Sequence, residues 1–142
     1  MFAGFGSSVT VVNREGGRSR SDRVAVPTTT FLTPPYSRVG ITEKEAREQG
    51  LAIKVATKPV AKIATMPRPK AVGETRGIVK AVVDADSGKI LGFAHHGIDS
   101  QEVVNLVALA MRTGTLAADL LNGIWVHLSS TELLNEVLGE LA

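Results

Sequence analysis

The segment VHLSSTELLNEVL, residues 126–138, contains the residue types that most readily move a proton near neutral pH. His127 stands five positions before Glu132, and a turn between them would fold the imidazole back over the start of the following helix. A carboxylate that holds a histidine in one tautomer makes an acid–base pair. The same stretch also suits a helix start, because Ser129 as N-cap and Glu132 three positions later have capping-box spacing. Spacing alone leaves both interpretations open.

Other residues capable of chemistry form weaker patterns. His95 and His96 are adjacent, and neighbouring side chains of a strand point to opposite faces, so the two imidazoles cannot easily chelate one metal ion. Gly4 and Gly6 lack the third glycine and the preceding strand of a dinucleotide fingerprint. We therefore expect no metal site and no nucleotide-binding loop.

The composition excludes further classes of chemistry. The chain has 142 residues, 44% hydrophobic and 21% charged, which suits one compact domain. It contains no cysteine, which excludes disulfides, thiolate metal sites and cysteine nucleophiles. No apolar run approaches the ~20 residues of a membrane helix, and the first residues lack the features of a signal peptide. We expect a cytoplasmic protein with no membrane partner.

Positive charge gathers in NREGGRSRSDR, which holds Arg14, Arg18, Arg20 and Arg23 among glycine and serine. Such an arm could contact phosphate or nucleic acid. We favour a solvated loop without a nucleic-acid partner, because no aromatic side chain lies between the arginines to stack on bases. A non-enzymatic structural or binding module with an Arg-rich arm is the alternative function.

Periodicity and turn residues predict four strands. Their expected ranges are 24–33, 51–60, 76–84 and 89–97, and ADSG joins the last two as a hairpin. In the second, Leu51, Ile53 and Val55 alternate with Lys54, which indicates a half-buried strand. PPYSRVG (34–40) is expected to interrupt the strands, and the proline-containing stretch 61–75 to be irregular.

Four helices are predicted around these strands. The first begins at Thr42 with a capping box to Glu45, and the second begins at Asp99, also with capping-box spacing, and ends at Gly114. A short helix covers 115–121, and the last has one apolar side made by Leu133, Leu134, Val137 and Leu141. This order predicts an α+β fold with a mainly antiparallel sheet covered by helices on one face.

These segments, in this order, resemble the dimerisation domain of the class I pyridine nucleotide-disulfide oxidoreductases, which include glutathione reductase, dihydrolipoamide dehydrogenase and mercuric reductase. TPPYSRVGITEKEA (33–46) is similar to the family's passage from a proline-containing strand to its first helix. TRGIVKAVVDADSGKILGFAHHGIDSQEVVNLVALAM (75–111) is similar to its hairpin and long helix. GGRSRSDRVAVP and STELLNEVL resemble the bacterial branch that acts on hypothiocyanous acid and responds to reactive chlorine.

The resemblance implies a role for the C-terminal pair. In the family a histidine, with a glutamate five positions later, introduces the closing helix, and His127 and Glu132 fall on those positions. It implies that the histidine acts as acid–base for a redox-active cysteine pair in the partner subunit of a homodimer, while the glutamate orients it. It also implies that electrons pass from NAD(P)H through FAD to that disulfide, and that the backbone of His127 and Leu128 touches the partner's FAD.

Three departures from the family pattern qualify this role. Leu128 replaces a proline whose bond to the histidine is cis in relatives, and a cis bond without proline costs ~3 kcal/mol. The redox cysteines and the nucleotide-binding domains are missing. FGSSVTVVNR resembles a strand of the family's NAD-binding domain, so we expect a remnant at 1–17 and a dimerisation domain at 18–142. We expect the isolated chain to hold no FAD and to be inactive.

Overall fold

A computed structural model describes residues 23–141. Its strands are β1 (Thr28–Thr30), β2 (Tyr36–Gly40), β3 (Ile53–Pro59), β4 (Ile78–Asp84) and β5 (Ile90–His96). Its α-helices are α1 (Glu43–Glu48), α2 (Arg68–Ala71), α3 (Ser100–Thr113), α4 (Ala117–Leu121) and α5 (Leu133–Val137). Short 3₁₀ turns lie at Val60–Lys62, Ser130–Glu132 and Leu138–Leu141.

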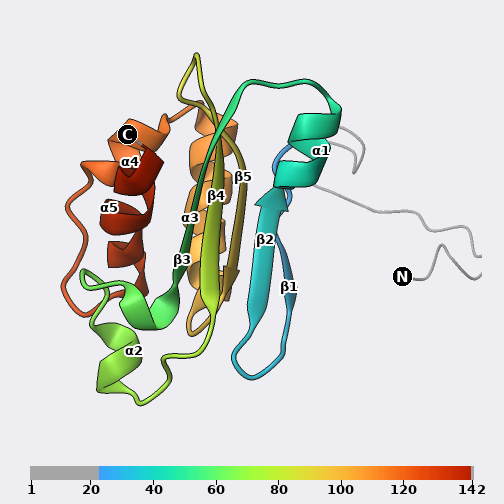
Figure 1. The fold of residues 1–142 in the computed structure, drawn as a ribbon. Helices are drawn as coiled ribbons and strands as arrows, with labels where there is room; N and C mark the ends of the chain where they lie inside the picture. Colours follow the sequence, from blue (N-terminus) through green and yellow to red (C-terminus); the bar gives the residue numbers. More distant parts are fainter. Residues whose placement is uncertain (1–22, 142) are drawn as a thin grey trace, which may run out of the picture.

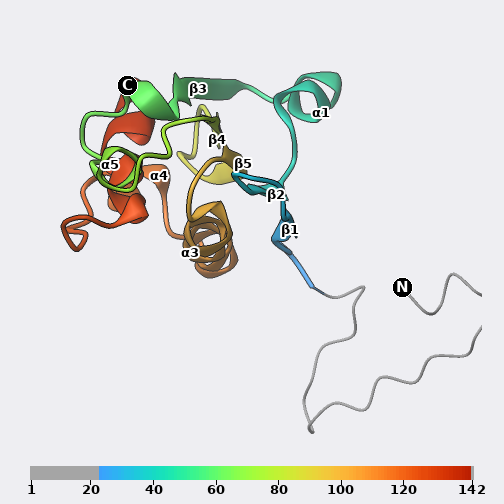
Figure 2. The ribbon, with the colours of Figure 1, turned by 90° about the horizontal axis from the view of Figure 1, so that it is seen from below.

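The strands form one antiparallel sheet in the order β1-β2-β5-β4-β3 (Figure 1). Helices α3, α4 and α5 cover one face of it, whereas α1 lies on the other side at one end of the sheet (Figure 2). The core between the sheet and the helices is apolar, and it includes Val79, Ala81, Phe93, Val103, Val107, Leu133, Leu134 and Val137. The predicted α+β fold, with an antiparallel sheet and a helical layer, is confirmed.

Strand β2 was not predicted, because PPYSRVG was expected to interrupt the strands. The two prolines precede the strand, which begins at Tyr36 and pairs with β1 and β5. Its helix-facing positions are Ser37 and Val39. Ser37 is fully buried, and its hydroxyl bonds those of Thr29 and Ser100 at 2.9 Å. A polar residue in the core hides the apolar alternation on which a strand prediction depends.

Strand β3 alternates as predicted, but its more apolar side faces away from the helices. Ala56 pairs with Ala81, and both belong to the core beneath the helices. Ile53 and Val55 therefore lie half-buried on the uncovered face, while Leu51 lies outside the strand. On the helical side Lys58 forms an ion pair with Glu136 of α5.

The stretch 61–75 was expected to be irregular and is partly helical. It starts within the 3₁₀ turn Val60–Lys62. Helix α2 begins just after Pro67, with Pro69 in its first turn, where a proline needs no backbone hydrogen bond. Ile63 and Met66 are almost completely buried, so this connection forms part of the core.

The helix caps and the hairpin turn were predicted more reliably than the strands and the connection 61–75. In α1, Thr42 Oγ1 accepts from the Glu45 amide and Glu45 Oε2 accepts from the Thr42 amide, which completes the predicted capping box. Helix α3 ends at Gly114, whose φ of 74° is left-handed. The β4–β5 hairpin also forms, and its turn is closed by Asp84, whose carboxylate accepts from the Ser87 amide at 2.7 Å.

Candidate active site: the His127 loop

A loop between α4 and the closing helix carries the sequence-predicted histidine. Its first residues are held by Asn135, whose side-chain amide donates to the Leu121 and Gly123 carbonyls at 2.7 and 2.9 Å. Leu133 and Leu134 are completely buried, and they anchor the helix that follows the loop. The core therefore fixes both ends of the segment that presents His127.

The structure brings His127 and Glu132 together. Nδ1 of His127 lies 3.0 Å from Oε1 of Glu132, and Oε2 of Glu132 accepts from the Ser129 amide at 3.1 Å. An ionised carboxylate only accepts hydrogen bonds, so this contact favours the His127 tautomer that carries its proton on Nδ1. Glu132 thus orients the imidazole and also completes its half of the helix cap, so the two interpretations of the spacing are compatible.

The two partners differ strongly in exposure. The His127 side chain is 77% exposed, whereas that of Glu132 is 14% exposed. Apolar neighbours in the loop are exposed as well: Ile124 completely, Val126 to 80% and Leu128 to 50%. A half-buried carboxylate therefore holds an imidazole that projects from the domain among apolar side chains. Such an arrangement is typical of a surface that another protein covers.

Leu128 gives the loop a backbone that proline could not adopt. Its φ is 68°, in the left-handed region, whereas proline is confined near −65°. Among the described residues the cis peptide bond joins Thr33 and Pro34, and not His127 and Leu128. The turn thus differs from the His-Pro turn that the resemblance implied, and it still brings His127 to Glu132.

His95 and His96 point to opposite faces of the sheet, as their adjacency on a strand requires. His95 faces the helices and is fully buried, and burial lowers the pKa of its imidazole to about 4. His96 lies on the uncovered face, edge-on to the Tyr36 ring with centroids 6.4 Å apart. No group of three or more potential metal ligands occurs within residues 23–141.

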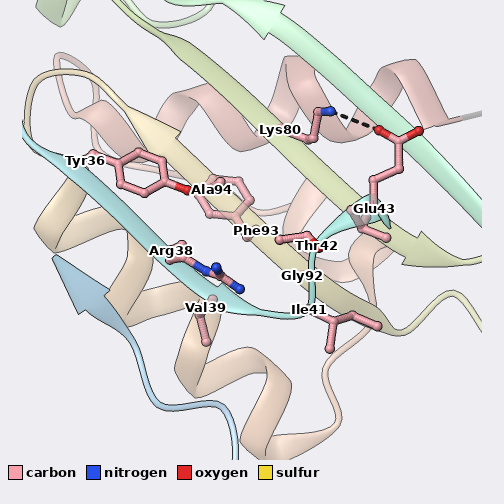
Figure 3. Close-up of a pocket in the computed structure, with 11 residues that line it drawn as sticks. Tyr36, Arg38, Val39, Ile41, Thr42, Glu43, Lys80, Gly92, Phe93 and Ala94 are labelled. Carbon is pink, nitrogen blue, oxygen red and sulfur yellow. Dashed lines mark hydrogen bonds and ion pairs between the residues drawn. The ribbon is translucent and has the colours of Figure 1, made fainter. Parts of the chain in front are cut away.

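A hollow of about 190 Å³ on the uncovered face was not foreseen from the sequence. Figure 3 shows Tyr36 and Arg38 of β2 on the same side of the sheet as Lys80, which donates to Glu43 at 2.9 Å. The hydrogen bonds from Lys80 and Arg47 lower the pKa of the Glu43 carboxyl. The lining comes from three separate stretches of sequence (36–43, 80–82 and 92–94), and only the folded sheet brings them together.

The hollows found on the described residues are small for a ligand site. Four hollows measure between 190 and 230 Å³, and typical ligand sites measure about 300–1,000 Å³. The expected remnant at 1–17, with Gly4 and Gly6, and three arginines of the basic arm (Arg14, Arg18 and Arg20) lie outside the described residues. Over residues 23–141, no helix has the length and apolar character that crossing a membrane requires.

Comparison with known proteins identifies the family. The family model described as "Pyridine nucleotide-disulphide oxidoreductase, dimerisation domain" matches residues 26–138. The "Probable pyridine nucleotide-disulfide oxidoreductase RclA" of Escherichia coli (strain K12) is 44% identical over 123 residues, which cover 87% of this chain and 27% of the relative. Dihydrolipoyl dehydrogenase of Zymomonas mobilis is 33% identical over 113 residues, which cover 78% of this chain and 23% of the relative.

A solved structure agrees with these sequence matches. The HOCl-induced flavoprotein disulfide reductase RclA from Escherichia coli superposes with a TM-score of 0.81 at 43% identity, covering 88% of this chain and 28% of that one. The chain thus spans only 23–28% of the length of these relatives. The likeness to a branch that responds to reactive chlorine is confirmed, since that reductase is induced by HOCl. The chain belongs to the pyridine nucleotide-disulfide oxidoreductase family, and its described residues form the dimerisation domain of such an enzyme.

Proposed function

We propose that this domain joins two subunits of a flavoprotein disulfide reductase into a homodimer and supplies His127 and Glu132 to the active site of the partner subunit. The observation that carries the proposal is the 3.0 Å contact between His127 Nδ1 and Glu132 Oε1 on a loop that projects from the domain. FAD and NAD(P)H, the cofactors of the parent enzyme, bind to its other domains.

The chemistry assigned to the pair is proton transfer. Because Nδ1 donates to Glu132, Nε2 is free to accept the proton of a thiol in the partner's redox-active cysteine pair. The resulting thiolate is the reactive form of cysteine, and the imidazolium returns the proton when the cysteine again becomes a leaving group. Glu132 holds the imidazole in the orientation that this proton transfer requires.

Dimerisation also explains the apolar surface around the histidine. Ile124, Val126 and Leu128 would be shielded from water by the partner subunit, and the backbone of His127 and Leu128 would lie beside its FAD. The chain by itself offers no cysteine for His127 to act on. Purified alone, it should be colourless and should oxidise neither NADH nor NADPH.

A chimeric reductase tests the proposal. Residues 23–142 replace the dimerisation domain of Escherichia coli RclA, and the FAD content, dimer mass and NAD(P)H oxidation of the purified chimera are measured. His127→Ala should lower kcat by about 10²–10⁴-fold, the range typical of a lost acid–base group. Glu132→Gln should lower kcat less. His96→Gln is the matched control, since it removes a histidine from the uncovered face of the sheet, and it should leave kcat unchanged.

The outcome against the proposal is equally clear. If a yellow, dimeric chimera carrying His127→Ala oxidises NAD(P)H as fast as the parent chimera, the pair has no role in the reaction. The domain would then be a purely structural dimerisation module.

A further inference from the structure

We infer that Asp99 is a positioning residue for the His127–Glu132 pair, and the inference rests on the proposed function. Asp99 touches neither member of the pair. It holds the short turn from which Glu132 projects, and it does so through the hydroxyl of Ser130.

A left-handed backbone directs the Asp99 carboxylate toward this turn. It precedes α3 and was expected to cap that helix, but its φ of 57° and ψ of 17° are left-handed and its side chain makes no capping hydrogen bond. The prediction of a capping box with Glu102 was therefore wrong. The carboxylate turns away from the helix, and Oδ2 accepts from Arg68 Nε at 3.3 Å and from Ser130 Oγ at 2.8 Å.

Ser130 links the Asp99 carboxylate to the turn that carries Glu132. It is 6% exposed and is the first residue of the 3₁₀ turn Ser130–Glu132. Two residues further on, Glu132 bonds His127 with one oxygen and the Ser129 amide with the other. The chain of contacts therefore runs from Asp99 through Ser130 to the carboxylate that orients the imidazole.

The remaining anchors hold the backbone and the helix behind the turn. Thr65 Oγ1 donates to the Glu132 carbonyl at 3.0 Å, and Glu136 accepts from the Ala64 and Thr65 amides at 2.7 and 2.8 Å. Together with buried Leu133, these contacts keep the closing helix in place. Removing the Asp99 carboxylate should therefore loosen the start of the turn without unfolding the domain.

The test uses the full chain, labelled with ¹⁵N in its histidines, and reads the ring nitrogens of His127 by long-range ¹H–¹⁵N NMR. Glu132→Ala removes the acceptor and defines the spectrum of an unpaired imidazole. Asp99→Ala and Ser130→Ala should each move the His127 resonances toward that spectrum. The Ser129 amide should exchange about tenfold faster, the factor expected when a hydrogen bond of ordinary strength is lost.

Two further variants make the result specific. Asp99→Asn keeps an oxygen that can accept from Ser130 and should restore the wild-type His127 spectrum. Glu102→Ala removes another carboxylate from the first turn of α3, and it should change neither the resonances nor the exchange. Thermal unfolding, measured on every variant, separates the positioning role from a merely structural one, which would lower the midpoint and leave His127 unmoved.

The inference is overturned if folded Asp99→Ala and Ser130→Ala both show wild-type His127 resonances. This readout concerns the geometry of the pair in the chain itself. It is therefore independent of whether His127→Ala inactivates the chimeric reductase, and the two ideas can fail separately.

Discussion

Acidification is expected to destabilise the domain through His95, a residue outside the candidate active site. The side chain is fully buried on β5, and neither ring nitrogen has a hydrogen-bond partner within the described part of the chain. Burial lowers the pKa of the imidazole from 6.5 to about 4, although the charge of Asp99 opposes this. The folded protein therefore keeps His95 neutral at a pH where the unfolded chain protonates it.

The sign of the effect follows from proton binding. Between pH 6.5 and 4 the unfolded state binds the proton and the folded state does not, so the free energy of unfolding falls as the pH falls. The contribution is fully present above the unfolded pKa. Relative to pH 7.5, the loss due to His95 is about 1.4 kcal/mol at pH 5.5 and about 2.5 kcal/mol at pH 4.5, at 1.36 kcal/mol for each pKa unit.

Urea unfolding of the wild type, His95→Leu and His96→Gln at these pH values measures the effect. Carboxylates whose pKa is lowered in the folded state, such as Glu74 and Asp84, also weaken the protein in acid, but they are common to all three proteins. The difference between the wild type and His95→Leu therefore isolates the buried ring. His96 lies on the opposite face and is the matched control.

We expect His95→Leu to lose about 2.5 kcal/mol less than the wild type on going to pH 4.5, while His96→Gln follows the wild type. At neutral pH the leucine variant should be at least as stable, because it removes two buried nitrogens without partners. Parallel pH dependences of the wild type and His95→Leu would refute the reasoning, since burial would then not control the proton on His95.

Three further changes should alter stability, each measured as the free energy of unfolding in urea. Gly92→Ala should lower the free energy of unfolding by about 3 kcal/mol or more, because a Cβ there would lie 1.8 Å from the Ile41 carbonyl oxygen. Gly139→Ala is the control and should be nearly neutral, since its Cβ would lie 3.5 Å from the nearest atom. Equal effects of the two substitutions would contradict this prediction. Leu128→Gly should raise the free energy of unfolding by about 1 kcal/mol, because glycine adopts the left-handed φ of this position without strain. A lower free energy of unfolding would contradict the left-handed conformation of Leu128. Thr42→Ala should lower the free energy of unfolding by about 1 kcal/mol, because it removes the N-cap of α1. An unchanged free energy of unfolding would show that this cap does not stabilise the domain.

Features set by neighbouring residues were the ones that the sequence predicted well. The α1 capping box, the β4–β5 hairpin and the end of α3 at Gly114 each depend on a few consecutive residues. The approach of His127 to Glu132 belongs to the same class, because five residues of turn suffice to bring the two groups together. The catalytic role that we propose for them involves a second subunit, which no local pattern reports.

Features set by distant residues were missed or misjudged. Asp99 was expected to cap α3, but Arg68 and Ser130, each 31 residues away along the chain, compete for its carboxylate. Strand β2 escaped prediction because Ser37 is buried against Ser100, 63 residues away. The hollow beside Lys80 likewise exists only once β2, β4 and β5 are paired. Tertiary partners decide such positions, and no local pattern reports them.

The most direct test of the proposed function is subunit mixing in the chimeric reductase. One parent dimer carries His127→Ala, and the other carries serine in place of a redox-active cysteine of the catalytic domain, so each is inactive alone. If His127 serves the partner subunit, random exchange should restore about a quarter of the parent chimera's activity, because half of the dimers are mixed and each has one complete site. If mixing restores no NAD(P)H oxidation although mixed dimers form, His127 does not act across the dimer interface, and the account is contradicted.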